Sequence, residues 1–242
     1  MRPRRLHQRG ISLFVVMVMV LLTTLIVLWT ARTALFNELV TGNDSDYQRA
    51  LEAAQAMVRD AEFDIKGQRP DGSPCKTGPG YEGSCRETLI DAAAGKVFFP
   101  QNAEDFQDLE AALSGRSPPC VKGICLSGNT AAEFWRTDAG ESGLDAMKSV
   151  AARYGEFTGA VATSAVGDPQ LVSSSTRDAN AWYWVEVLPY DVGAAVAPGP
   201  AQTFKPDTTA PYIYRITGIA QGLKSSTRAV VQTVFVWRKV DS

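Results

Sequence analysis

The chain has 242 residues, of which 45% are hydrophobic and 21% are charged, and its formal net charge is −2. This composition excludes a wholly disordered or collagen-like chain. The near balance of charge argues against a dedicated nucleic-acid binder, because such proteins carry a basic excess. The length suffices for one or two domains with a sizeable core.

A short basic leader precedes the first apolar segment. Residues 1–10 contain four arginines and no acid, and residues 10–31 contain no charge. At about 1.5 Å per residue, a helix over residues 11–31 would span roughly the 30 Å hydrocarbon core of a bilayer. Because arginines favour the cytoplasmic side, we expect one span of the inner membrane with the rest of the chain in the periplasm.

The single histidine, His7, lies inside this leader. If the leader is removed, the mature chain has no histidine, which excludes a Ser-His-Asp triad, a Cys-His dyad and a His-ligated metal site. The sequence also lacks nucleophile and phosphate-binding motifs. We therefore predict neither an enzyme nor a cofactor.

Three interpretations of the N-terminus compete. A secretory signal peptide would have a shorter apolar region and an A-x-A-like cleavage site, and residues 30–34 offer no clean site. An uncleaved signal anchor would keep its leader. The third interpretation rests on the junction itself, where Gly10 closes the leader and Ile11 begins the apolar helix at once.

This junction resembles the type III signal of type IV pilins and pseudopilins. The resemblance implies that a prepilin peptidase cuts after Gly10, that Ile11 becomes the mature N-terminus, and that the apolar helix stays on the mature protein. Most members of the class have a glutamate as the fifth mature residue, whereas this chain has Val15. The departure points to the subclass with an apolar fifth residue, which includes PilX-type minor pilins and GspK pseudopilins.

Helix-like sequence continues to about residue 66, with residues 42–45 as a kink or a short break. After it, one apolar stripe recurs at steps of four and three, made of Tyr47, Leu51, Ala54, Val58, Ala61 and Ile65. Most charged residues, Arg59 and Asp60 among them, are expected off this stripe. The stripe requires a sheet or a helix to cover it. Residues 47–56 also resemble the alanine-rich segment that follows the membrane helix in PilX-type proteins.

All four cysteines, Cys75, Cys85, Cys120 and Cys125, fall in a turn-rich middle region. The predicted compartment is oxidising, so disulfides are expected. Three pairings exist, and short sequence separation favours Cys75–Cys85 and Cys120–Cys125. A four-thiolate zinc site fits the spacings poorly, and the sequence has no calcium-loop pattern. We therefore predict no metal site.

Helical spacing predicts two short helices, over Ala103 to Leu113 and over Leu144 to Tyr154. Strand formers dominate three later segments, residues 181–189, 212–219 and 228–238. The last two read as an antiparallel hairpin. Residues 192–210 lack periodicity and are expected to form an exposed loop.

One long helix followed by strands is an α+β arrangement. We expect a membrane-spanning N-terminal helix packed on a C-terminal antiparallel sheet, with a disulfide-containing inserted region. The expected parts are a leader over residues 1–10, a long helix over residues 11–66 and an α+β head over residues 67–242. This arrangement resembles the pilin fold along the entire chain.

The resemblance implies a PilX-type minor pilin that takes part in type IV pilus assembly, in a tip or priming complex. The implied partners are other minor pilins, the major pilin, a tip adhesin, the prepilin peptidase and inner-membrane lipid. The subunit would move from the inner membrane to the pilus on assembly. Without the leader the chain has 20 basic and 26 acidic residues, a formal charge of −6, so direct binding of nucleic acid is not expected.

Two alternatives stay open. A GspK-like minor pseudopilin of a type II secretion system shares the processing and the apolar fifth residue, but such proteins usually carry a larger inserted helical domain. A signal-anchored periplasmic binding or sensor module would keep its leader and present a ligand pocket. Five aromatic residues could line such a pocket: Trp182, Trp184, Tyr212, Tyr214 and Trp237. Aromatic residues in strands are more often core residues or cross-strand pairs.

Overall fold

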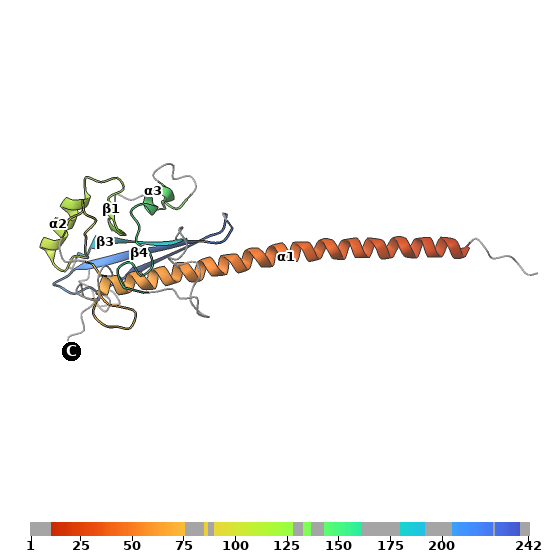
Figure 1. Cartoon of the computed structure of the whole chain (residues 1–242), viewed down its shortest axis with the longest axis horizontal. Coiled ribbons are helices and arrows are strands. Elements are labelled where there is room, and N and C mark those ends of the chain that lie inside the picture. Colours follow the sequence, from red (N-terminus) through yellow and green to blue (C-terminus); the bar gives the residue numbers. More distant parts are fainter. Residues whose placement is uncertain are drawn as a thin grey trace, which may run out of the picture. The chain divides into compact units, whose positions relative to one another are not determined.

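The computed structural model describes residues 11–75, 85–86, 90–127, 133–136, 143–160, 180–191, 205–224 and 226–237. Its elements are α1 (Ile11–Lys66), α2 (Ala103–Leu113), β1 (Cys120–Val121), β2 (Ile124–Leu126), α3 (Leu144–Lys148), β3 (Ala181–Pro189), β4 (Tyr212–Gln221) and β5 (Arg228–Phe235) (Figure 1). The chain divides into two compact units, residues 1–45 and residues 46–242.

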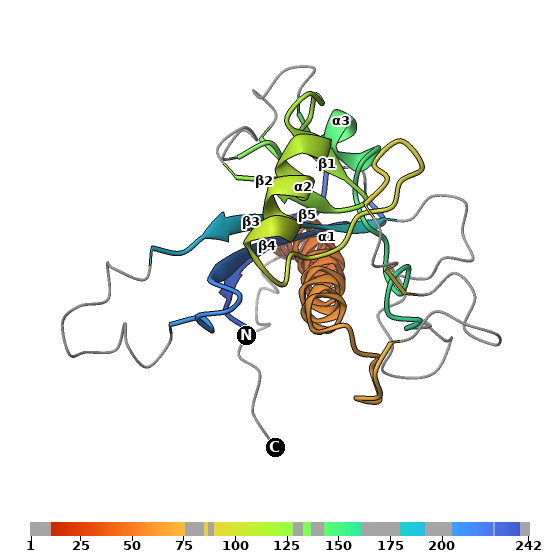
Figure 2. The same ribbon diagram turned by 90° about the vertical axis from the view of Figure 1, so that its left-hand side faces the viewer.

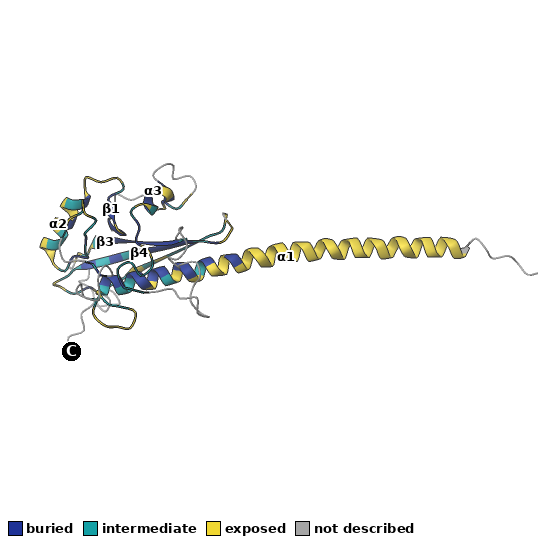
Figure 3. Cartoon of the chain, viewed as in Figure 1, coloured by how far each residue is buried: buried dark blue, intermediate teal, exposed yellow. Residues whose placement is uncertain are grey.

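The first unit contains the N-terminal part of α1, whose large apolar side chains are exposed (Figure 3). Four threonine hydroxyls in this part donate to backbone carbonyls three or four residues earlier, those of Thr23, Thr24, Thr30 and Thr33. These hydroxyls are therefore satisfied inside the helix, as a hydrocarbon environment demands.

The helix α1 continues through residues 42–45, so the short break considered from the sequence does not occur. Glycine inside a helix costs only about 1 kcal/mol relative to alanine. Tertiary contacts made further along the helix outweigh a cost of that size.

The second unit contains a five-stranded sheet with the strand order β1-β2-β3-β4-β5. The strands β3, β4 and β5 form an antiparallel meander, and β1 pairs with β2 in a tight antiparallel hairpin. The strand β2, however, runs parallel to β3, so the sheet is mixed and the expectation of a purely antiparallel sheet is wrong at this pair. The short strands β1 and β2 lie in the cysteine-rich region expected to form loops, and a long crossover that includes α3 permits the parallel pairing.

The two short helices predicted from the sequence are both present, and one of them is shorter than predicted. The helix α2 has the predicted bounds, and the side chain of its N-cap Asn102 accepts a hydrogen bond from the backbone of Asp105. The helix α3 ends at Lys148 instead of Tyr154, because Ala152 leaves the helical path and pairs with Tyr183 of β3. Most of the expected loop, residues 192–204, lies outside the described residues.

Both faces of the sheet are covered (Figure 2). Along β3, Tyr183 and Val185 contribute to the core cluster that contains α1, whereas Trp182 and Trp184 contribute to the cluster that contains α3. A strand buried on both faces has apolar residues in both alternation sets. The alternation pattern alone therefore could not assign its faces.

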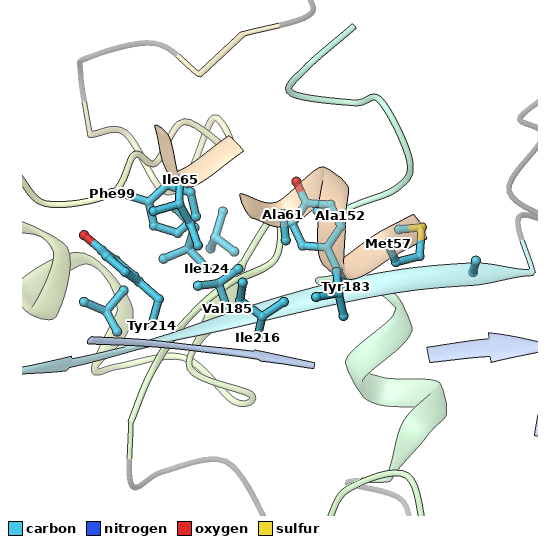
Figure 4. Close-up of a cluster of buried hydrophobic side chains, with 14 of the residues drawn as sticks. Met57, Ala61, Ile65, Phe99, Ile124, Ala152, Tyr183, Val185, Tyr214 and Ile216 are labelled. Carbon is cyan, nitrogen blue, oxygen red and sulfur yellow. The ribbon is translucent and has the colours of Figure 1, made fainter. Parts of the chain in front are cut away.

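The C-terminal part of α1 packs on the sheet through small side chains. Ala53, Ala54 and Ala61 are fully buried, and Met57 and Ile65 lie over Tyr183, Val185 and Ile216 in one cluster (Figure 4). The predicted stripe is confirmed from Ala54 to Ile65, but Tyr47 at its start is exposed.

The helix and the sheet approach each other closely at Gly218 of β4. A Cβ at this position would lie 2.6 Å from the carbonyl oxygen of Ala54 and 2.9 Å from a methyl carbon of Val58. The first contact is with backbone, so it cannot be relieved by a side-chain rotation. Glycine here sets how near α1 lies to the sheet.

We expect Gly218→Ala to destabilise the head by about 1–3 kcal/mol, because the added methyl group overlaps the α1 backbone. The matched control is Gly115→Ala, whose Cβ would meet nothing within 4 Å and whose effect should stay within about 0.5 kcal/mol. Guanidinium unfolding of the full chain in detergent micelles, followed by tryptophan fluorescence, measures both. Equal losses in the two variants would contradict the close approach.

Candidate assembly site

The N-terminal part of α1 is the first candidate element for assembly. By length and composition this helix could cross a membrane, with a mean hydropathy of 2.7 over its most apolar window, none of which is buried. Leu28 and Trp29 are 71% and 74% exposed. A contiguous apolar surface of this extent is unfavourable in water, so lipid or another protein must cover it.

The processing residues named from the sequence lie at the beginning of this helix. Gly10 is outside the described residues, and Ile11 is described only by its backbone, as the first residue of α1. Val15 is 48% exposed on α1, and the first turn of the helix has no acidic residue. The helix therefore presents an uncharged surface around Val15.

The structure contains the two disulfides that short sequence separation favours, Cys75–Cys85 and Cys120–Cys125. The second joins the two strands of the β1–β2 hairpin, in which Cys120 and Cys125 are directly paired. The described residues contain no free cysteine and no group of three or more His, Cys, Asp or Glu that could hold a metal ion.

A buried ion pair connects α1 to the chain that follows the first disulfide. Arg86 and Asp64 are 6% and 2% exposed in their side chains, and the guanidinium donates to both carboxylate oxygens at 2.7 to 2.9 Å. Arg86 also donates to the carbonyls of Val97 and Lys122, and lies 3.7 Å from the ring centroid of Phe157. One side chain thus holds α1 and three loops together.

Asp64 receives a further hydrogen bond from the sheet. The hydroxyl of Tyr183 in β3 donates to it at 2.7 Å. Burial, together with the nearby Asp64 carboxylate, raises the pKa of Tyr183 well above its usual range, so the phenol stays a neutral donor. Asp64 therefore has the cation and the donors that a buried carboxylate needs.

Asp60 lies one helical turn before Asp64 and holds the loop that contains Phe157. Its carboxylate accepts the backbone N–H of Gly155 at 2.8 Å and the hydroxyl of Thr158. Burial raises the pKa of Asp60 to about 6, although these two hydrogen bonds oppose the shift. The expectation that Asp60 lies off the buried stripe is wrong, because the loop that covers it supplies the donors that solvent would otherwise provide.

Sequence reasoning missed Asp60, Asp64 and Arg86. A signal for the first two was available, since two acids one turn apart flank Ala61 on the helix face that carries Met57 and Ile65. The partner of Asp64 had no comparable signal. Arg86 follows Cys85 in a turn-rich region, and nothing local relates it to a helix that ends 20 residues earlier.

Four of the five aromatic residues considered as the lining of a ligand pocket belong to the core, and the fifth, Trp237, is partly buried against it. Trp182 and Trp184 lie in the cluster with α3, and the indole N–H of Trp184 donates to the carbonyl of Met147. Tyr212 and Tyr214 lie in the other cluster. The two pairs therefore face opposite sides of the sheet and line no common pocket.

A long apolar helix that leads into an α+β head with two short disulfide loops defines a class, the membrane-anchored pilin-like subunits. Two family models match this chain. The first, described as "Type IV pilus assembly protein PilX C-term", matches residues 106–237, and the second, described as "PilX N-terminal", matches residues 9–59.

Because the first match alone covers more than half of the chain, the chain belongs to the PilX family of type IV pilus assembly proteins. It is a minor pilin in type IV pilus assembly, and neither a type II secretion pseudopilin nor a sensor module is favoured by any observation. The family is a structural component of the pilus and not a known enzyme family. No curated protein and no solved structure matches the chain.

We expect Arg86→Met to cost about 3–5 kcal/mol of unfolding free energy, because it leaves the Asp64 carboxylate buried without its cation. The control is Arg136→Met, which breaks an exposed pair with Glu133 and should cost less than about 1 kcal/mol. Replacing both partners, as Arg86→Met with Asp64→Leu, should recover part of the loss. Denaturant unfolding of the full chain in micelles measures these differences, and similar costs for the two single variants would refute the assignment.

Asp60 should make the head less stable as the pH rises. The pKa of its carboxyl is about 6 in the folded state against 3.8 ordinarily, so the folded state binds more protons between these values and its stability falls through that window. The shift corresponds to a loss of up to about 3 kcal/mol. Asp60→Asn should lack this decline, whereas Asp108→Asn, at an exposed position on α2, should retain it. Unfolding free energies measured across the window test the slope, which must differ between the two variants.

Proposed function

We propose that this minor pilin acts at the tip of the pilus, in a priming complex with other minor pilins. The observation that carries the proposal is Val15, an exposed apolar residue at the position where most pilins have a glutamate. In a filament that glutamate would offset the terminal ammonium of a neighbouring subunit in the apolar core. A subunit at the tip has no such neighbour above it, and a carboxylate there would be buried without a partner.

The processing of the chain follows the pilin pattern in this proposal. A prepilin peptidase removes residues 1–10 by cutting after Gly10, and Ile11 becomes the N-methylated first residue. The leader arginines are cytoplasmic, residues 11–31 span the inner membrane, and the head, residues 67–242, is periplasmic before assembly. After assembly the head is exposed on the pilus.

Assembly then exchanges lipid for protein around the apolar helix. The exposed apolar side chains of α1 would contact the helices of the major pilin and of other minor pilins. The threonine hydroxyls, which are bonded within the helix, need no new partner in either environment. The head is free to contact neighbouring subunits and a tip adhesin.

The experiment combines the mature N-terminus with the position of the subunit in the pilus. We expect the subunit recovered from sheared pili to begin at Ile11 by intact mass, and a gold-labelled C-terminal tag to lie at filament ends. Val15→Glu should lower the number of pili severalfold, because the new carboxylate has no partner in the apolar core. Val15→Ala is the control and should leave the number unchanged.

Two results would overturn the proposal at different points. A subunit in the filament that still carries the leader would exclude cleavage after Gly10. Label distributed along the shaft would exclude the tip position, even with correct processing.

A further inference from the structure

A cleft of about 610 Å³ opens beside the turn between β1 and β2. Three cationic residues line it, Lys122 in the turn, Lys148 at the end of α3 and Arg153 in the loop that follows, and Glu156 is the one acid among its lining residues. The chain as a whole carries a formal charge of −2. The cleft therefore has locally the opposite sign.

The acid in the cleft is engaged on both of its oxygens. Glu156 Oε1 accepts the Lys122 ammonium at 2.7 Å, and Oε2 accepts the backbone N–H of Arg153 at 3.0 Å. The Arg153 side chain is exposed, and its guanidinium has no hydrogen bond or ion pair within the described residues. A planar guanidinium in this state is suited to bind a carboxylate through two parallel hydrogen bonds.

The second cation of the cleft, Lys148, is held in place by contacts that leave its charge accessible. The Lys148 ammonium lies 4.8 Å from the ring centroid of Trp182 and donates to Asp145 at 3.0 Å. The Asp145 side chain is 96% exposed, so water screens this pair. Lys148 is thus oriented by an aromatic ring and open to exchange its partner.

Separate contacts hold the two walls of the cleft in place. The Cys120–Cys125 disulfide closes the hairpin that carries Lys122. On the other side, the Asp60 carboxylate holds the loop by its hydrogen bonds to Gly155 and Thr158. A site built before binding loses little conformational freedom when a ligand enters.

We propose that this cleft docks a carboxylate-rich segment of a neighbouring pilus protein. The inference rests on the pilus role only for the identity of the partner, since the cleft lies entirely in the head. Nucleic acid is disfavoured as the occupant, because it requires an extended basic surface and the chain without its leader has a formal charge of −6 from 20 basic and 26 acidic residues. A short acidic segment, by contrast, can bind to a small positively charged cleft on a chain whose net charge is negative.

The test uses the full chain in neutral detergent micelles and fluorescein-labelled hexaglutamate as the probe, followed by fluorescence anisotropy. We expect saturable binding at low ionic strength that weakens at physiological salt. Arg153→Ala should weaken binding at least about fivefold, since it removes the one bidentate cation. Arg59→Ala, at an exposed position on α1 outside the cleft, is the matched control and should have no effect.

A second variant separates a binding role from a structural one. Glu156→Gln releases Lys122 from its ion pair, so hexaglutamate should bind severalfold more tightly, whereas damage to the fold would weaken it. Thermal unfolding by circular dichroism establishes that each variant is folded.

Three outcomes overturn the inference: the absence of saturable binding, an equal loss in Arg59→Ala and Arg153→Ala, or tighter binding of hexathymidylate than of hexaglutamate. The last would make the cleft a site for a phosphate polymer. None of them affects the pilus measurements on Val15, so failure of the cleft and failure of the tip role are distinguishable.

Discussion

The carboxylate of Asp64 is buried between α1 and the sheet, and it forms an ion pair there with the guanidinium of Arg86. Removing either charge from water costs free energy. The attraction within the pair offsets this desolvation penalty only when the remaining hydrogen-bonding positions are also satisfied. The carbonyls of Val97 and Lys122 and the phenol of Tyr183 complete it. The arrangement of these loops over α1 therefore depends on the guanidinium of Arg86. This residue directly follows Cys85, which is held by a disulfide.

The same helix serves two environments with two kinds of surface. In the first unit its large apolar residues are exposed, as a membrane or a filament core requires. In the second unit its alanines allow the backbone to approach Gly218, and Asp60 and Asp64 hold the loops that cover it. A pilus subunit must keep its head folded while the surroundings of its apolar segment change. Because Asp60 and Asp64 both lie in the second unit, the contacts that hold the head together do not involve the apolar segment.

Much of the fold could be predicted because its signals are local. The apolar run before Arg32, the period of the stripe from Ala54 to Ile65 and the dense strand formers of β3 and β4 each reflect a pattern contained in one segment. Short sequence separation favoured the two disulfides that the structure contains. The parallel pairing of β2 with β3 could not be predicted in this way, because strands of two and three residues have no period to detect.

The sequence by itself determined the apolar helix, the residue at position 15 and the α+β class, since each depends on composition or on short spacing. It favoured one pairing of the cysteines among three, and the structure decided for that pairing. Only the tertiary structure decided that Asp60 is buried, that Arg86 pairs with Asp64, and that three cations meet in one cleft. The physical reason is that the partner of a buried charge is chosen by the fold. Residues 22 positions apart or more meet only after loops have closed over the helix, and no local pattern records that choice.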